Sequence, residues 1–491
     1  MRLPVPARGS RDRPAGSRTA DVGLVILGAA LLAGMVTDRF VLAAGALAGA
    51  AILFLTVGSP VRIAALVFSI QILFTITQLS AAEFYAGFLA FRVDDLLSMW
   101  LFWLWVLALP DGAVRRGGPV GRTGWWIGVF LALVALSAYR GLSTGNDPEF
   151  VGEQIKTYGA YLFYFPMLWV LSDGRAWPLL WRILVASAAV SGLVIMIKGF
   201  TGSGEGVYYR EETGLRIGTR QPNAIGAVMM VFLGRLWKDW RNRPPILFTL
   251  PAIAMMGGAL ILSQTRGLWG GVLLAMTSAW ILNLFRREPG VRMGRKLVVS
   301  ITVLAVMVSV TVLVVSALGI LSAADIAQRT GSESGNYLTD TSILSRILSW
   351  IAVIGKLDGP HLLLGRGMGE TITYFKPEFM EMRTMFFVDS SYFQTALIMG
   401  VTGTAALLMV WLTALVRAAR LFLRTTDRTR AGLALGIFCA VIMLLFASAF
   451  ASPLTNYNYT ILWVFLLALL QSEIGREALL SGKDRGGIFG P

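Results

Sequence analysis

Long apolar stretches recur along the chain from Val22 almost to the C-terminus, separated by short segments rich in charge, Gly and Pro. A bilayer-spanning helix needs about 20 mostly apolar residues, so the pattern predicts about 14 membrane spans. We place them at residues 22–37, 40–57, 60–79, 95–110, 123–139, 157–172, 178–198, 223–238, 245–263, 267–285, 297–320, 391–416, 431–450 and 457–473. The predicted fold class is an all-α, polytopic integral membrane bundle.

Composition and charge orient these spans. Hydrophobic residues make up 56% of the chain and charged residues only 14%, against about 25% charged in soluble domains. The net charge of +15 could indicate nucleic-acid binding, but the basic residues gather in short connections such as 235–243, 286–296 and 417–430. With both termini inside, about 28 of the 43 Lys and Arg face the cytoplasm, as the positive-inside rule requires. Topology therefore accounts for the charge, and no nucleic-acid partner is expected.

This orientation divides the chain into five parts. We predict a basic cytoplasmic tail at 1–21, eleven spans within 22–320, a large external loop at 321–389, three spans within 390–473 and a cytoplasmic tail at 474–491. The Arg-rich start resembles the charged region of a signal peptide. Because no small-residue cleavage site and soluble domain follow it, we expect a retained first helix.

Two external segments, 201–222 and 321–389, are much longer than the other connections. Long loops on a rigid scaffold are where function tends to lie. Within the longer segment, residues 342–356 form an amphipathic pattern that predicts a helix lying on the membrane surface or capping the bundle. Its apolar face comprises Ile343, Ile347, Leu348, Ile351 and Ile354.

Several kinds of chemistry are excluded by what the chain lacks. Cys439 is the only cysteine and His361 the only histidine, so neither a disulfide within the chain nor a His-rich metal centre is expected. There is no phosphate-binding loop, and the run Gly365–Gly369 lacks the context of a dinucleotide site. Nearly all charges fall at the ends of spans, which argues against an ion pathway. We predict no metal and no cofactor.

External arginines near the ends of spans are the main candidates for binding. Guanidinium groups match phosphate oxygens through paired donors, so a convergent cluster suits a pyrophosphate carried on a lipid. These residues could instead extend toward the interface or pair with Glu211, Glu212 and Asp340. The candidates are Arg210, Arg216, Arg220, Arg266, Arg346 and Arg366.

Four motifs, in order along the chain, resemble those of the O-antigen ligase and polymerase superfamily of bacterial envelope glycosyltransferases. They run from Arg216 to Leu412, with the long loop before the twelfth span. The motifs are Arg216-Ile-Gly-Thr-Arg-Gln-Pro-Asn223; Ser263-Gln-Thr-Arg-Gly267; Ser345-Arg-Ile-Leu-Ser-Trp350 with Leu362-Leu-Leu-Gly-Arg-Gly-Met-Gly369; and Asp389-Ser-Ser-Tyr-Phe-Gln394 with Gly400-Val-Thr-Gly403.

The resemblance implies a metal-independent transfer of glycan from a polyprenyl-pyrophosphate donor to a sugar hydroxyl, on the periplasmic face of a bacterial inner membrane. Arg216, Arg266 and Arg366 would contact the pyrophosphate or the transition state, with Arg220 and Arg346 as second choices. Asp389 would be the general base; alternatively, Asp389 or Ser390 could only cap the following helix. Asn223 has the same two alternatives. Arg210, His361 and Tyr392 are further candidates for substrate contact, and His361 could equally be structural.

One departure from the family pattern bears on whether the chain is a ligase or a polymerase. Ligases of the superfamily usually begin the fourth motif with His-Asn, where this chain has Asp389-Ser390. The Asp is more similar to polysaccharide polymerases, so we favour polymerisation of lipid-linked glycans, with a chain-length regulator as a possible partner. A ligase acting on lipid A-core or protein, a flippase for lipid-linked sugars and a structural scaffold are the alternatives. The long loop and the lack of buried charges argue against a flippase.

Overall fold

The computed structural model describes residues 60–74, 84–86, 89–91, 93–109, 120–172, 176–201, 207–210, 214–217, 222–239, 244–263, 265–286, 341–377 and 379–480. The predicted spans at 22–37, 40–57 and 297–320 lie outside these residues, as do both tails apart from residues 474–480. The chain divides into two compact units, Met1–Ile63 and Ala64–Pro491. All described elements except the first turn of α3 belong to the second unit.

The described residues are mainly helical, which confirms the helical class, and three short two-stranded hairpins add to it. The sequence pattern did not predict these hairpins. The elements in chain order are α3 (Pro60–Phe74), β1 (Phe84–Ala86), β2 (Leu89–Phe91), α4 (Val93–Ala108), α5 (Gly121–Ser143), α6 (Pro148–Gly159), η3 (Ala160–Phe163), α7 (Tyr164–Ser172), α8 (Ala176–Thr201), β3 (Val207–Arg210), β4 (Gly214–Ile217), α9 (Pro222–Lys238), α10 (Ile246–Leu262), α11 (Arg266–Phe285), α14 (Thr341–Lys356), α15 (Pro360–Leu364), β5 (Ile372–Lys376), β6 (Glu381–Met385), α16 (Ser391–Arg424), α17 (Arg428–Phe450), η6 (Pro453–Thr455) and α18 (Tyr457–Leu480).

Among the described helices, five are long and apolar enough to cross a membrane, namely α5, α8, α11, α16 and α17. Each coincides with a predicted span, which supports an integral membrane protein, but the total of about 14 spans is not confirmed. The predicted span at 157–172 is broken into the end of α6, the 3₁₀ turn η3 and α7. Pro166 accounts for the break, because its ring and its missing N–H disturb the helical turn that precedes it.

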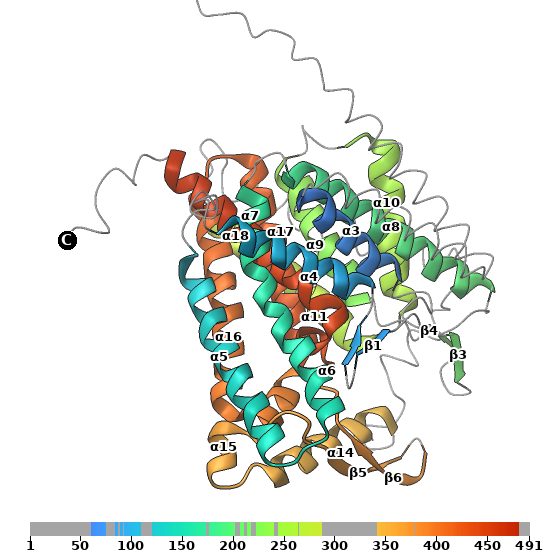
Figure 1. The fold of residues 1–491 in the computed structure, drawn as a ribbon. Coiled ribbons are helices and arrows are strands. Elements are labelled where there is room, and N and C mark those ends of the chain that lie inside the picture. The colour runs from blue at the N-terminus through green and yellow to red at the C-terminus, as the bar shows by residue number, and fades with distance from the viewer. Residues whose placement is uncertain are drawn as a thin grey trace, which may run out of the picture. The chain divides into compact units, whose positions relative to one another are not determined.

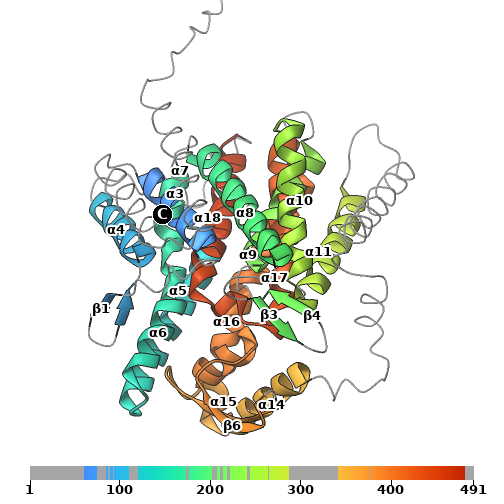
Figure 2. The ribbon, with the colours of Figure 1, turned by 90° about the vertical axis from the view of Figure 1, so that its right-hand side faces the viewer.

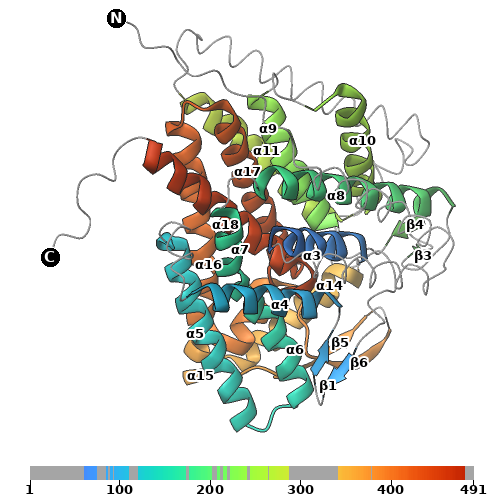
Figure 3. The ribbon, with the colours of Figure 1, turned by 45° about the horizontal axis from the view of Figure 1, so that its top comes forward.

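Helix α17 lies at the centre of the described bundle and packs against α9, α11 and α16 (Figures 2 and 3). Its contact with α9 is close because glycines face each other. A Cβ added to Gly436 would lie 2.4 Å from the Cα of Val231, and one on Gly234 would lie 2.5 Å from the backbone nitrogen of Gly436. Small residues allow backbones to approach so closely inside a membrane. The spacing Gly432-xxx-Gly436 is therefore the packing motif of α17.

Buried aromatic side chains next to α18 have their polar atoms paired. The Trp411 indole N–H donates to the Tyr161 hydroxyl at 3.1 Å, and that hydroxyl donates to the Leu454 carbonyl at 3.3 Å. Trp463 donates to the carbonyl of Pro453 at 2.8 Å. Unpaired polar groups are costly in an apolar interior, so these bonds allow large aromatic rings to fill it.

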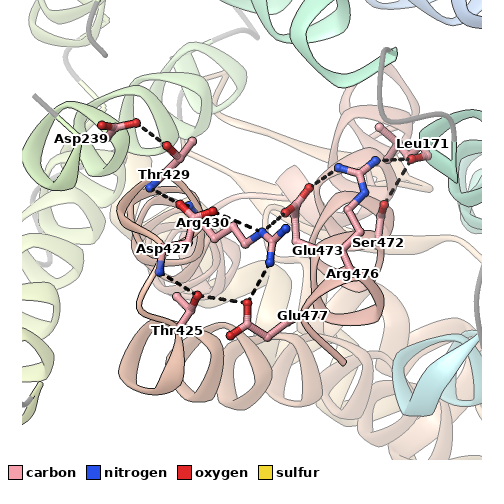
Figure 4. Close-up of polar contacts among 10 residues, drawn as sticks. All are labelled: Leu171, Asp239, Thr425, Asp427, Thr429, Arg430, Ser472, Glu473, Arg476 and Glu477. Atoms are coloured by element: carbon pink, nitrogen blue, oxygen red, sulfur yellow. Dashed lines mark hydrogen bonds and ion pairs between the residues drawn. The ribbon is translucent and has the colours of Figure 1, made fainter. Parts of the chain in front are cut away.

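Figure 4 shows a polar network at one end of the bundle, which we call the Arg430 end. The Arg430 guanidinium lies 3.3 Å from the Glu473 carboxylate and donates to Glu477 at 3.0 Å. Arg476 donates to Glu473 at 2.6 Å and to the Leu171 carbonyl at 2.9 Å. Thr429 donates to Asp239 at the end of α9. These bonds join α7, α9, α17 and α18 at the end that charge counting assigns to the cytoplasm.

Candidate functional site

Elements from the long loop gather at the opposite end, which we call the loop end. Figures 1 and 2 show α14, α15, β5 and β6 together where α5 ends. The loop is thus an ordered cap from Thr341 onward, and its predicted amphipathic helix is confirmed as helix α14. The earlier part of the predicted loop, 321–340, lies outside the described residues.

Three helices begin at the loop end around the last turns of α17. A Cβ on Gly226, the fifth residue of α9, would contact Met443 at 3.0 Å, and one on Gly267 of α11 would lie 3.4 Å from the Phe450 Cβ. The backbone N–H of Ser391, the first residue of α16, donates to the Ala451 carbonyl at 3.0 Å. The helices that begin at the ends of the first, second and fourth motifs therefore start around one place. Helix N-termini carry partial positive charge, so this arrangement favours an anion.

Asp389 and Ser390, adjacent in the fourth motif, have different surroundings at the start of α16. Ser390 is the N-cap, because its hydroxyl accepts from the Phe393 N–H, and it also donates to the Ser448 carbonyl at 3.1 Å. Asp389 is exposed and has no hydrogen bond or ion pair among the described residues. Of the two residues for which capping was the alternative, Asp389 and Ser390, it is Ser390 that caps the helix. Its carboxylate is left accessible beside the converging helix starts.

Helix α16 is interrupted at Gly400, where φ is +68°, and the loop occupies the interruption. The N–H groups of Arg366 and Gly367 donate to the carbonyls of Leu397 and Ile398 at 2.8 and 3.1 Å. Ser137 of α5 also donates to Ile398, at 2.8 Å. Carbonyls that a broken helix leaves unpaired are thus satisfied by the loop.

The glycines of the third motif make this contact possible. A Cβ on Gly365, whose φ is +68°, would lie 2.3 Å from the carbonyl carbon of Ile398. Only glycine combines that backbone conformation with so close an approach. The run Gly365–Gly369 thus holds the loop between α5 and α16, which fixes the backbone of Arg366.

The Arg366 side chain is half-buried and held within the loop. Its Nε donates to the Lys356 carbonyl and its Nη2 to the Asp358 carboxylate, both at 2.8 Å. Lys356 is in turn paired with Glu370. Asp358 is mostly exposed, so its ion pair with Arg366 is weak and open to exchange with a phosphate.

Helix α14 lies over the start of α16. The Trp350 ring stacks on Phe393, with centroids 5.2 Å apart and planes 12° from parallel. Trp350 Nε1 and Arg346 Nε are buried, and neither has a hydrogen-bond partner in the part of the chain that the structure describes. Such donors are rarely left unsatisfied in native proteins, so they mark a place for a ligand or water.

The buried face of α14 differs from the predicted apolar face. Ser345, Ser349 and Val353 are buried, whereas Ile351 and Ile354 of the predicted face are exposed. The packed stripe consists of small residues because α14 lies close to the rest of the loop end. The larger isoleucines face outward, as a helix at a membrane surface would require.

The other predicted site residues have diverse surroundings. Asn223 is the second residue of α9, not its cap, and its Oδ1 is buried without a partner among the described residues. Tyr392 donates to the Leu445 carbonyl of α17 at 2.6 Å. His361 Nδ1 lies 3.2 Å from the Gly365 carbonyl, a local contact that supports the structural alternative.

Four predicted arginines are described only in part or not at all. Arg210 and Arg216 lie on the two strands of the β3–β4 hairpin, where Arg216 pairs with Tyr208 in register. Arg266 is the first residue of α11. Their side chains, and the whole of Arg220, lie outside the described part of the chain. Their predicted contacts with a pyrophosphate remain predictions.

Sequence reasoning assigned no role to the amides that fix the loop. Gln394 accepts from the Val388 N–H at 2.7 Å and donates to the Phe386 carbonyl at 3.1 Å. Gln154 of α6 accepts from the Gly369 N–H at 2.9 Å. Asn146 donates to the Met368 carbonyl at 2.8 Å. Gln394 is the last residue of the fourth motif, so the sequence could have indicated its role. Gln154 and Asn146 lie in segments that matched no motif.

No group of three or more His, Cys, Asp or Glu side chains among the described residues could hold a metal ion. The polar groups described at the loop end include arginine and indole donors, the accepting Oδ1 of Asn223, helix N-termini and the exposed carboxylate of Asp389. This set can bind an anion and accept a proton. It fits group transfer from a phosphate-linked donor.

Comparison with known families supports this interpretation. The family described as O-Antigen ligase matches residues 251–408, about a third of the chain. The matched segment contains the second, third and fourth motifs, whereas the first motif, Arg216–Asn223, precedes it. A comparison with curated proteins found no match. The family supports a glycosyltransferase-like function acting on lipid-linked glycans in a membrane. Residues 251–408 are therefore similar to the O-antigen ligase family, in agreement with the resemblance that the motifs carry.

Proposed function

We propose that the chain transfers glycan from a polyprenyl-pyrophosphate donor to a sugar hydroxyl at the loop end, and that this end faces the periplasm. The observation that carries the proposal is the convergence of the starts of α9, α11 and α16 at the end of α17. Three partial positive charges and the unpaired Arg346 Nε can together stabilise a departing pyrophosphate.

The chemical step is a displacement at the anomeric carbon of the donor. A bond forms from the acceptor oxygen to that carbon, while the bond to the pyrophosphate oxygen breaks and the pyrophosphate leaves with the electron pair. Asp389 takes the proton of the acceptor hydroxyl. Arg366 contacts the pyrophosphate after it exchanges Asp358 for phosphate oxygens. No metal is needed, because arginines and helix termini supply the positive charge.

Polymerisation is the form of the reaction that we favour. Asp389-Ser390 stands where ligases of the superfamily usually have His-Asn, and the exposed, unpaired carboxylate of Asp389 is suited to act as a base. The acceptor would then be a second lipid-linked glycan. Transfer to lipid A-core or protein is the alternative outcome that experiment can distinguish.

The test is incubation of the purified protein in vesicles with a lipid-linked oligosaccharide, with and without a separate acceptor. A ladder of products indicates a polymerase, and a single adduct on the separate acceptor indicates a ligase. No covalent product, with donor moved across the bilayer, would contradict the proposal and indicate a flippase.

Variants connect that activity to the site. Arg366→Ala and Arg216→Ala should abolish transfer while the amount of protein in the membrane stays unchanged. Arg420→Ala is the matched control, because Arg420 is exposed near the Arg430 end of α16. Transfer at the rate of the unaltered protein in both site variants would exclude these arginines from the reaction.

A further inference from the structure

The β5–β6 hairpin carries an exposed apolar surface at the loop end. On one face Ile372 and Tyr374 are buried. On the other face Phe375 and Met382 are direct cross-strand neighbours. With Phe379 and Met380 in the turn they form what we call the hairpin tip, with 38%, 63%, 51% and 78% of the respective side chains exposed. So many large apolar side chains on a protruding turn mark an interaction surface.

Backbone conformation supports a role for this surface. Met380 has a φ of +53° and is the one non-glycine residue with a positive φ among those described. A glycine or an asparagine would adopt this conformation with less strain. The strained turn keeps the long apolar side chain of Met380 at its most exposed point, which indicates that this side chain takes part in an interaction.

The polar groups of the hairpin are arranged as at a membrane interface. The Arg383 guanidinium lies 3.8 Å from the Phe379 ring centroid, and the Lys376 ammonium lies 5.2 Å from it. On the exposed face, the hydroxyls of Thr373 and Thr384 hydrogen-bond to each other at 2.9 Å. Arg383 is also ion-paired with Glu381, the cross-strand neighbour of Lys376. Lys376, beside the aromatic ring, is thus the cation that can meet a lipid phosphate, and the paired hydroxyls reduce the cost of leaving water.

The surroundings of the hairpin favour a bilayer over a protein partner. Figures 1 and 2 show the hairpin at the end where α5 stops, and α5 is one of the candidate membrane spans. Helix α15 contacts that end of α5 through a bond from Arg140 to the Leu364 carbonyl at 2.6 Å. Its Leu362, Leu363 and Leu364 are exposed like Leu142 of α5, so the apolar surface of the span continues into the loop.

We propose that the hairpin tip inserts into the boundary between headgroups and acyl chains at the loop end, and that it anchors the external loop to the bilayer. The insertion is shallow. A two-stranded hairpin has unpaired backbone groups along both edges, and these cannot enter the hydrocarbon core. Lys376 and Arg383 stay at the level of the phosphates.

The experiment uses the full chain with its only cysteine removed by Cys439→Ala. A single cysteine introduced by Met380→Cys is labelled with an environment-sensitive nitrobenzoxadiazole dye, and the protein is placed in phosphatidylcholine and phosphatidylglycerol vesicles. The matched control carries the label at Glu149→Cys, a polar and exposed position at the same end. Label at Met382→Cys repeats the test should the Met380 variant not fold.

The label at 380 should emit at a shorter wavelength than the label at 149. A nitroxide attached high on the lipid acyl chain should quench it more strongly than one near the chain end. Emission equal to that of the control, without quenching by lipid nitroxides, would overturn the proposal. A blue shift without such quenching would place the tip against protein, such as a second copy, and would overturn it too. None of these readouts depends on glycan transfer, so they remain decisive even if the proposed reaction is wrong.

Discussion

The two ends of the described bundle use similar residue types in opposite ways. At the Arg430 end, Arg430 and Arg476 each contact carboxylates, and the network joins four helices (Figure 4). At the loop end, Arg346 Nε, Trp350 Nε1 and Asn223 Oδ1 are buried without hydrogen-bond partners among the described residues. Arg417 Nη1, near the Arg430 end, is also buried without a partner among the described residues. The contrast therefore lies in the ion pairs: charged side chains join helices at the Arg430 end, whereas Arg346 at the loop end has no ion pair among the described residues and can accept a ligand.

The largest effect should come from closing the space that holds the loop. In Gly365→Ala the new Cβ would lie 2.3 Å from the Ile398 carbonyl carbon, at a φ of +68°. Overpacking and strain together should cost more than about 3 kcal/mol. We expect protease sensitivity of the loop and loss of transfer, measured by limited proteolysis and by the product ladder.

Gly355→Ala is the matched control, because Gly355 lies in α14 with nothing within 4 Å of an added Cβ. It should keep or raise stability by about 0.5–1 kcal/mol, since alanine favours a helix. If Gly365→Ala and Gly355→Ala had the same stability and transfer, the close contact between the loop and α16 would be excluded.

Breaking the Arg430 end should affect stability without affecting chemistry. Arg430→Met leaves the buried Glu473 with Arg476 alone and removes the ion pair with Glu477. Because Glu473 keeps Arg476, the cost should stay below about 3–5 kcal/mol, the cost of an uncompensated buried charge. Thermal unfolding in detergent should occur at a lower temperature, while transfer per folded molecule stays the same. Arg420→Met, at an exposed position, should change neither the unfolding temperature nor transfer. A lower transfer rate per folded molecule in Arg430→Met would contradict the division of roles between the two ends.

Asp389→Asn, at the loop end, should lower transfer without changing stability. If Asp389 is the general base, transfer should fall by about 10²–10⁴-fold. Stability should not change, because Ser390 caps the helix and Asp389 has no partner among the described residues. Ser390→Ala is the matched variant, and loss of the cap should lower the free energy of unfolding by about 1 kcal/mol. Reduced stability in Asp389→Asn with normal transfer would assign a structural role instead.

The contrast between the ends also explains which features the sequence could predict. Apolar runs define helices because each span must satisfy its own backbone hydrogen bonds, so α5, α8, α11, α16 and α17 coincide with predicted spans. The break at η3 was missed because the run around Pro166 is apolar throughout. The spacing Gly432-xxx-Gly436 was present in the sequence but was not singled out as a packing motif.

The site was predictable where its residues lie in local motifs. The second, third and fourth motifs meet around the end of α17 and the broken α16, and their order along the chain carried the resemblance that the family match over residues 251–408 supports. The partners of Gln154 and Asn146 were not predictable, because each bonds to a residue more than 200 positions away. The face of α14 that is buried, with Ser345, Ser349 and Val353, was not predicted for the same reason. Its packing depends on distant elements, not on its own amphipathic pattern.

Tyr392→Phe should have the smallest effect. It tests whether the Tyr392 hydroxyl, at the loop end, serves packing or substrate contact. The phenol donates to the Leu445 carbonyl at 2.6 Å, which ties α16 to α17. Removal of one such bond should lower the free energy of unfolding by about 0.5–1.5 kcal/mol. If the hydroxyl serves packing alone, transfer per folded molecule will not change. Tyr139→Phe is the control, because that side chain is exposed on α5 and should change neither quantity. A loss of transfer at unchanged stability would instead assign the Tyr392 hydroxyl to the substrate and extend the open site onto the contact between α16 and α17.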